Sequence, residues 1–69
     1  MIEFLLHLRM AEKRINQKEL SKATGIGKNS INRYFNNTTT QITKEHLNLL
    51  CQYFQCPIQE IIRYVPDNK

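Results

Sequence analysis

A row of hydrogen-bonding side chains in the segment 28–36 is the feature of this sequence best suited to chemistry. Helical spacing places Ile31, Tyr34 and Phe35 on one face of that segment. The opposite face then presents a set of polar side chains: Asn29, Asn32, Arg33 and Asn36, flanked by Lys28 and Ser30. Arginine can hydrogen-bond guanine, asparagine can bond adenine, and serine can bond either base. The pattern therefore predicts contact with base edges.

The positive charge of the chain is concentrated around this segment. Ten Lys and Arg residues against six Asp and Glu give a formal charge of +4. Residues 9–33 contain seven basic and two acidic residues, a local charge of +5, whereas residues 34–69 contain three of each. No acidic residue lies between Glu19 and Glu45. Such a surface suits a polyanion, although an ordinary solvated basic face would carry the same charges.

The length of the chain limits both architecture and function. With 69 residues, we expect one domain over residues 1–69. A chain of this size buries only about 60% of the surface that it exposes when unfolded, which leaves little room for an enclosed substrate pocket. We therefore expect no enzyme, and the residues suggest no catalytic group, cofactor or small-molecule ligand. The hydrophobic content of 41% excludes a disordered tail, and two Gly and two Pro favour a helical module.

The sequence shows no sign of a membrane or an export signal. The first nine residues have no basic start and no small-residue cleavage site, and Glu3 and His7 interrupt their apolar run. No apolar run approaches the ~20 residues that cross a bilayer. We therefore expect a soluble, cytoplasmic protein that does not associate with membranes.

Hydrophobic spacing predicts five helices and no strand. The first would run from about Ile2 to Lys13 or Arg14, with one apolar stripe at Phe4, Leu8, Ala11 and Ile15 and a second at Ile2, Leu6 and Met10. The next two would span 17–24 and 28–36. A fourth would follow Thr43 and bury Leu47, Leu50, Cys51 and Phe54, and a fifth would run from Pro57 to Pro66 with Ile58, Ile61, Ile62 and Val65 on one face. Residues 67–69 should fray.

Specific residues mark where these helices begin and end. Asn16 and Glu19 have the spacing of a capping box before residue 17. Gly25 suits the left-handed conformation that follows a helix, and Thr43 is a suitable N-cap. Gly27 would cap the segment 28–36 without a side chain.

A zinc site at His46, Cys51 and Cys56 is the alternative that the cysteines raise. Their spacing of five places successive residues on different sides of a helix, and the sequence has no second Cys/His pair. We therefore interpret both cysteines as free structural thiols and expect no metal.

Several segments together resemble the phage repressor and Cro-type helix-turn-helix family. The resemblance lies in Leu8-Arg9, in INQKELSKATGI at residues 15–26, in SINRY at residues 30–34, in Asn36-Asn37, in residues 47–51 and in CPIQEII at residues 56–62. It covers most of the chain. The segment 17–37 corresponds to the family's helix-turn-helix, and residues 47–51 and 56–62 correspond to its fourth and fifth helices.

The resemblance implies a compact, all-α, five-helix domain of the lambda-repressor-like fold that binds double-stranded DNA and regulates transcription. The helix 28–36 would read bases in the major groove. The positions that match the family's base-reading and flanking residues are Lys28, Asn29, Ser30, Asn32 and Arg33. The positions expected at the DNA backbone are Gln17, Lys18, Lys22, Asn36, Asn37 and Thr38. A repressor or Cro-like protein of bacterial or phage origin is expected, which acts as a homodimer on an operator because one helix reads only a few base pairs.

Three positions depart from the family pattern: Gly27 where Ser or Thr is common, Asn37 where Gly is usual, and Phe35 where a polar residue is frequent. Asparagine tolerates the left-handed conformation that Gly normally supplies. The alternative hypothesis is a protein-interaction module of antitoxin or anti-repressor type, which would dock through the stripe at Ile2, Leu6 and Met10.

Overall fold

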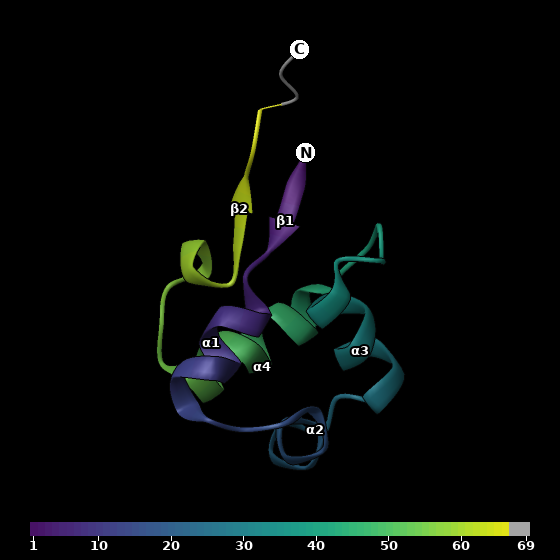
Figure 1. Ribbon diagram of the computed structural model, residues 1–69, viewed down its shortest axis with the longest axis vertical. Helices are drawn as coiled ribbons and strands as arrows, with labels where there is room; N and C mark the ends of the chain where they lie inside the picture. Colours follow the sequence, from purple (N-terminus) through teal and green to yellow (C-terminus); the bar gives the residue numbers. More distant parts are fainter. Residues whose placement is uncertain (67–69) are drawn as a thin grey trace.

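Four helices form the body of the molecule, and two short strands project from it side by side (Figure 1). The computed structural model describes residues 1–66, so the predicted fraying of residues 67–69 lies outside the described residues. In chain order the elements are β1 (Ile2–Phe4), α1 (Leu6–Lys13), α2 (Gln17–Thr24), α3 (Lys28–Asn36), α4 (Lys44–Phe54), the 3-10 turn η1 (Ile58–Glu60) and β2 (Ile62–Tyr64). None of the helices described is long and apolar enough to cross a membrane.

The boundaries predicted for α2 and α3 and the start predicted for α4 are confirmed. The Glu19 N–H donates to the Asn16 side chain (2.8 Å) and the Asn16 N–H donates to the Glu19 carboxylate (3.0 Å), which completes the capping box. The Thr43 hydroxyl accepts from the His46 N–H at 3.0 Å. Gly25 is left-handed with φ 82°, and Gly27 caps α3 without a side-chain bond. These ends are local, so sequence alone specifies them.

The core draws one or two side chains from every helix. The fully buried side chains are Leu6, Leu20, Ile26, Ile31, Leu50 and Ile61. They come from α1, α2, the α2–α3 turn, α3, α4 and the residue after η1. The core therefore holds α3 by its inner face and leaves its other face outside.

The first helix begins later in the chain than predicted. Residues 2–4 form β1, and α1 begins at Leu6. The buried side chains of α1 are Leu6 and Met10, whereas Leu8 is exposed. The helical stripe predicted at Phe4, Leu8, Ala11 and Ile15 is therefore wrong. The second stripe is largely core, so the docking surface of the interaction-module hypothesis does not exist as predicted: Leu6 and Met10 are 0% and 2% exposed.

The predicted fifth helix is also wrong, and so is the absence of strands. Pro57 is followed by only one 3-10 turn, after which Ile62–Tyr64 pairs antiparallel with β1. The register places Ile2 opposite Tyr64 and Phe4 opposite Ile62. Short apolar runs fit a strand or a helix equally well, and here the ends of the chain supply each other's hydrogen bonds. The domain is mostly helical rather than all-α, and the described residues contain four α-helices rather than five.

Asn37 ties β1 to the end of α3. It is left-handed with φ 58°, as its sequence position suggested. Its Oδ1 accepts from the Phe4 N–H at 2.7 Å, and its Nδ2 donates to the Phe4 carbonyl at 3.2 Å. One amide thus occupies both backbone groups of Phe4, in the way that a neighbouring strand would.

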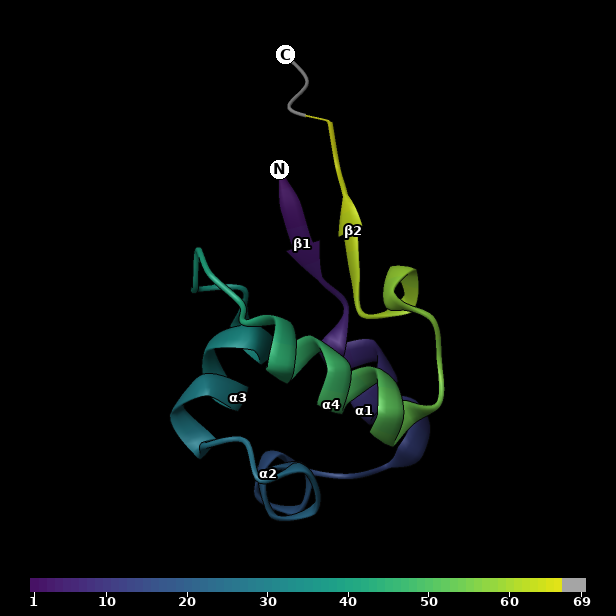
Figure 2. The ribbon, with the colours of Figure 1, turned by 180° about the vertical axis from the view of Figure 1, so that it is seen from behind.

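Two ion pairs connect the ends of the chain to the helical body or to each other. Arg9 of α1 contacts Glu60 of η1 at 2.6 Å, and Arg63 of β2 contacts Glu3 of β1 at 2.7 Å. Seen from behind, η1 lies beside the outer side of β2, as it does from the front (Figures 1 and 2). The C-terminal segment therefore closes over α1 instead of forming a helix of its own.

Candidate nucleic-acid interface

The turn between α2 and α3 is held by side chains from within the unit. The Ser21 hydroxyl donates to the Ile26 carbonyl (2.6 Å), and the Thr24 hydroxyl donates to the Leu20 carbonyl (2.8 Å). The Ile26 N–H in turn donates to Thr24 Oγ1 (3.2 Å). Ile26 is also buried, so these bonds and its burial together fix the orientation of α3 relative to α2, as a helix-turn-helix requires.

Helix α3 has the two faces that its sequence predicts. Ile31 and Tyr34 are buried, and Phe35 packs against the core from a half-buried position. Among the predicted base-reading residues, Ser30 is half-buried and the others are exposed: Lys28, Asn29, Asn32 and Arg33. The structure therefore brings this set together on one outward face of one helix.

Two asparagines on this face are linked to each other. Asn36 Nδ2 donates to Asn32 Oδ1 across one helical turn. Within residues 1–66 the Asn32 Nδ2 donor makes no further bond. The pair thus keeps a donor available on the outward face, in the middle of the predicted reading set.

The basic residues divide into a paired group and an unpaired group. Arg9 and Arg63 are held by carboxylates, and Lys13 lies over the Tyr53 ring at 5.3 Å from its centroid. Among the described residues, no carboxylate or ring engages the cations of α2 and α3: Lys18, Lys22, Lys28 and Arg33. Arg14 and Lys44 are likewise without such a partner among the described residues, so most of the available positive charge, but not all of it, is on the helix-turn-helix. Arg9 instead stabilises the fold.

The residues predicted at the DNA backbone occupy two places beside α3. Gln17 is half-buried at the first position of α2, and Lys18 and Lys22 are exposed on that helix. Asn36 and Thr38 are exposed at the end of α3, where the Thr38 N–H donates to the Arg33 carbonyl (3.0 Å). Asn37 differs from the others, because both polar atoms of its side chain are bonded to Phe4.

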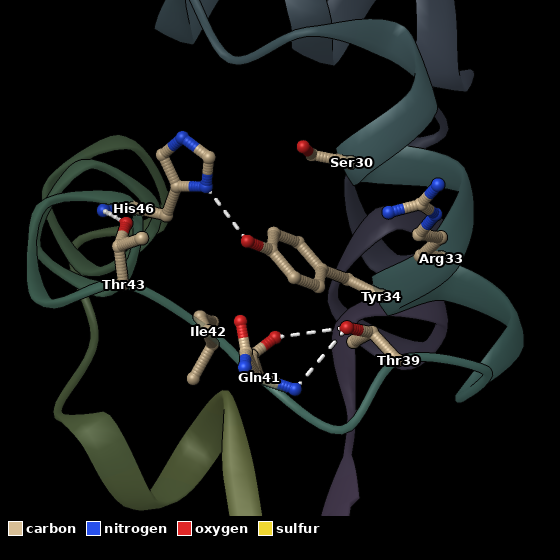
Figure 3. A pocket seen from close by; sticks show the side chains of 8 residues that line it. All are labelled: Ser30, Arg33, Tyr34, Thr39, Gln41, Ile42, Thr43 and His46. Atoms are coloured by element: carbon tan, nitrogen blue, oxygen red, sulfur yellow. Dashed lines mark hydrogen bonds between the residues drawn. The ribbon is translucent and has the colours of Figure 1, made fainter.

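A small open pocket separates α3 from the start of α4 (Figure 3). Its volume is about 180 Å³. The Tyr34 hydroxyl and His46 Nδ1 lie 2.7 Å apart across it and join the two helices. Burial raises the pKa of the Tyr34 hydroxyl above its ordinary value, so it remains protonated. The loop side is held by Thr39, whose hydroxyl bonds both the carbonyl and the N–H of Gln41.

Sequence reasoning missed the loop and helix residues that complete this pocket. Ser30 and Arg33 were singled out from α3, and Thr39 lies in the loop 36–40 that the resemblance placed at the DNA backbone, but Gln41 and His46 were not assigned to the site. His46 was weighed only as a metal ligand, yet it positions Tyr34. The available signal was its place three residues after the Thr43 cap, which puts it on the first turn of α4.

The two cysteines are free, half-buried thiols. Burial is the main cause that raises the pKa of the Cys56 thiol, with nearby Cys51 adding to it. Within the described part of the chain, no three His, Cys, Asp or Glu side chains gather to hold a metal ion.

Comparison with known proteins connects this geometry to a family. Residues 6–67 match the family model described as a Cro/C1-type HTH DNA-binding domain. A search of the curated proteins found no match to the chain. The matched range contains α1 to α4, η1 and β2, so it includes the whole of the α2–α3 unit.

Proposed function

The chain belongs to the Cro/C1-type helix-turn-helix DNA-binding family, and from this premise we propose that it is a sequence-specific regulator of transcription, a repressor or Cro-like protein. It acts by occupying operator DNA. The observation that supports this proposal is the outward face of α3, where hydrogen-bonding side chains stand exposed on a helix held by its other face. An α-helix of this kind fits the major groove of B-DNA, which is ~12 Å wide.

The proposed base contacts are made by five residues of α3: Lys28, Asn29, Ser30, Asn32 and Arg33. Arg33 has no internal ion pair among the described residues, so its guanidinium is available for a guanine edge. The Asn32 Nδ2 donor is free for a base acceptor, because Asn36 uses only the Asn32 oxygen.

The proposed phosphate contacts surround that helix: Gln17, Lys18, Lys22, Asn36, Asn37 and Thr38. Lys18 and Lys22 supply unpaired charge, which raises affinity for every sequence alike and makes binding sensitive to salt. Asn37 differs from the other five, because both polar atoms of its side chain already bond the Phe4 backbone.

One α3 helix reads too few base pairs to select a site in a genome, so the operator is expected to contain two half-sites. Two protomers would place their α3 helices about 34 Å apart on one side of the duplex.

Selection of bound duplexes from a random pool tests this proposal, because it reports sequence preference and half-site spacing together. On the selected duplex, Arg33→Ala should weaken binding by about 1–3 kcal/mol and relax preference at one base position. Lys22→Ala should weaken all duplexes alike and lower the slope of affinity against salt.

Arg63→Ala is the matched control, because it removes the same charge from β2, where the arginine is paired with Glu3. It should leave base preference unchanged. The assignment of α3 fails if Arg33→Ala and Arg63→Ala have equal effects, and the function fails if no duplex is enriched at low salt.

A further inference from the structure

Two cysteines flank the end of α4, and neither belongs to the proposed DNA contacts. Cys51 lies in the last turn of α4, and Cys56 is the second residue after the helix, which ends at Phe54. Both are free, half-buried thiols that pack against the hydrophobic core. Between them Gln55 takes the left-handed conformation, with φ 52°, and turns the chain back. A spacing of five would put the two cysteines on different sides of a continuous helix, but α4 ends between them.

The backbone at this helix end brings the two cysteines together. The N–H groups of Gln55 and Cys56 both donate to the Cys51 carbonyl, the second at 3.2 Å. The bond from Cys56 is that of a Schellman motif, in which the side chains of the two bonded residues commonly contact each other. With standard backbone dimensions, the 3.2 Å bond limits the distance between the two Cα atoms to about 7 Å at most. Disulfides usually join Cα atoms about 4.4–6.8 Å apart.

The end of α1 shows how this motif directs side chains in the same molecule. There the Ile15 N–H donates to the Met10 carbonyl at 3.2 Å, across the left-handed Arg14. Met10 belongs to the core cluster and Ile15 packs against it. The motif thus turns both of its side chains to the inner side, where Cys51 and Cys56 also pack at the end of α4.

Electrostatic coupling between the two thiols agrees with this geometry. The pKa of the Cys56 thiol is raised mainly by burial and next by Cys51, ahead of the effects of Glu60 and Arg9. Coulomb interactions weaken with distance, so Cys51 is among the titratable groups close to Cys56.

We propose that Cys51 and Cys56 are a reversible oxidation site, which a low-molecular-weight disulfide converts to an intramolecular disulfide within the intact fold. The thiolate of one cysteine attacks a sulfur of the small disulfide, which forms a mixed disulfide and releases one small thiol. The thiolate of the other cysteine then attacks the protein sulfur, forms the new S–S bond and releases the second small thiol. The protons of the two cysteines end on the two released thiols, so the protein loses two electrons and the small disulfide gains them.

The bridge would fasten the C-terminal segment to α4. That segment is held to the rest of the fold by the Arg9–Glu60 ion pair and by the pairing of β2 with β1. Closing a ring over residues 51–56 removes conformations mainly from the unfolded chain, so the oxidised protein should unfold less readily, with an unfolding constant lower by roughly tenfold or more. The bridge lies at the end of α4 that points away from α3 (Figure 2), so the inference does not rest on the proposed function.

Equilibration with mixtures of reduced and oxidised glutathione, followed by acid quenching and mass spectrometry, tests this inference without DNA. The folded protein should lose two hydrogen atoms and carry no glutathione. Its disulfide should be favoured over the dithiol by roughly tenfold or more relative to the same protein unfolded in urea. By linkage, the same factor should separate the urea unfolding constants of the oxidised and reduced proteins.

The double variant Cys51→Ser/Gln52→Cys is the matched control. It keeps two thiols and brings them closer in sequence, but Gln52 is an exposed position of α4 and does not bond Cys56. Its folded form should lose the preference for the disulfide, by roughly tenfold or more relative to the wild type. The single variants Cys51→Ser and Cys56→Ser should retain one glutathione as a mixed disulfide, because the second thiol that would displace it is missing.

Two results would overturn the inference. The first is a folded wild type that stays reduced, or that accumulates mixed disulfide, in a glutathione mixture that closes the ring in the urea-unfolded protein. The second is a double variant that favours its disulfide as strongly as the wild type, which would show that the helix-end motif is not the cause. The first comparison uses the wild type alone, so it decides the question even where circular dichroism shows that a variant is unfolded.

Discussion

Replacing Asn37 with glycine should destabilise the domain, although Asn37 is a left-handed residue. Relief of the left-handed strain would on its own stabilise the protein by roughly 0.5–1 kcal/mol. The substitution also removes the 2.7 Å and 3.2 Å bonds to the Phe4 backbone. Each contributes about 1 kcal/mol net. The balance is a loss of roughly 1–1.5 kcal/mol, or about 5–10 °C in Tm.

Thermal and urea unfolding, followed by circular dichroism, measure this change. Gln55→Gly is the matched control, because Gln55 ends α4 with φ 52° and its side chain makes no bond within the described residues. It should gain roughly 0.5–1 kcal/mol from the same relief of strain. If Asn37→Gly proved as stabilising as Gln55→Gly, the amide would not be anchoring β1, and the reasoning would be refuted.

Three further predictions follow from other local features. Gly27→Ser should stabilise the folded domain by about 0.5 kcal/mol, whereas Gly25→Ala should destabilise it by about 1 kcal/mol. An added Cβ meets no atom within 4 Å at either position, so the difference comes from the positive φ, which only Gly25 has. Equal changes in Tm would contradict this. The raised pKa of Tyr34 means that its contribution to stability is complete below its unfolded pKa and declines as pH rises through its higher folded pKa. Urea midpoints between about pH 8 and pH 11 should therefore fall less steeply in Tyr34→Phe, and unchanged slopes would count against it. Burial raises the pKa of the Cys56 thiol. At about pH 8, iodoacetamide should therefore modify Cys56 more slowly in the folded protein than in urea-unfolded protein. Equal rates of modification, measured by mass spectrometry, would show that the fold does not protect this thiol.

The helix-turn-helix could be predicted from the sequence because its signals are local. The capping box at Asn16 and Glu19, the left-handed Gly25 and the Thr43 cap each act within a few residues. The outward face of α3 followed from 3.6-residue spacing once Ile31 and Tyr34 were taken as core. Its base-reading roles remain predictions, since they depend on a DNA partner.

The ends of the chain could not be predicted in the same way. Ile2–Phe4 and Ile62–Tyr64 are each three residues long, too short for helical and strand periodicity to differ. Their pairing spans about sixty residues of sequence, and no local propensity reports it. The same holds for Asn37, whose sequence position indicated a left-handed turn but not the bonds to Phe4.

The sequence by itself determined α2, α3 and α4, the caps between them and the concentration of basic residues on the α2–α3 unit. The tertiary structure decided which cations stay available: Arg9 is paired with Glu60, whereas Arg33 has no pair among the described residues. It also decided that β1 lines a hollow beside the loop after α3. The physical reason is range, because helix and cap signals act over about four residues, whereas ion pairs and strand edges depend on distant segments meeting in space.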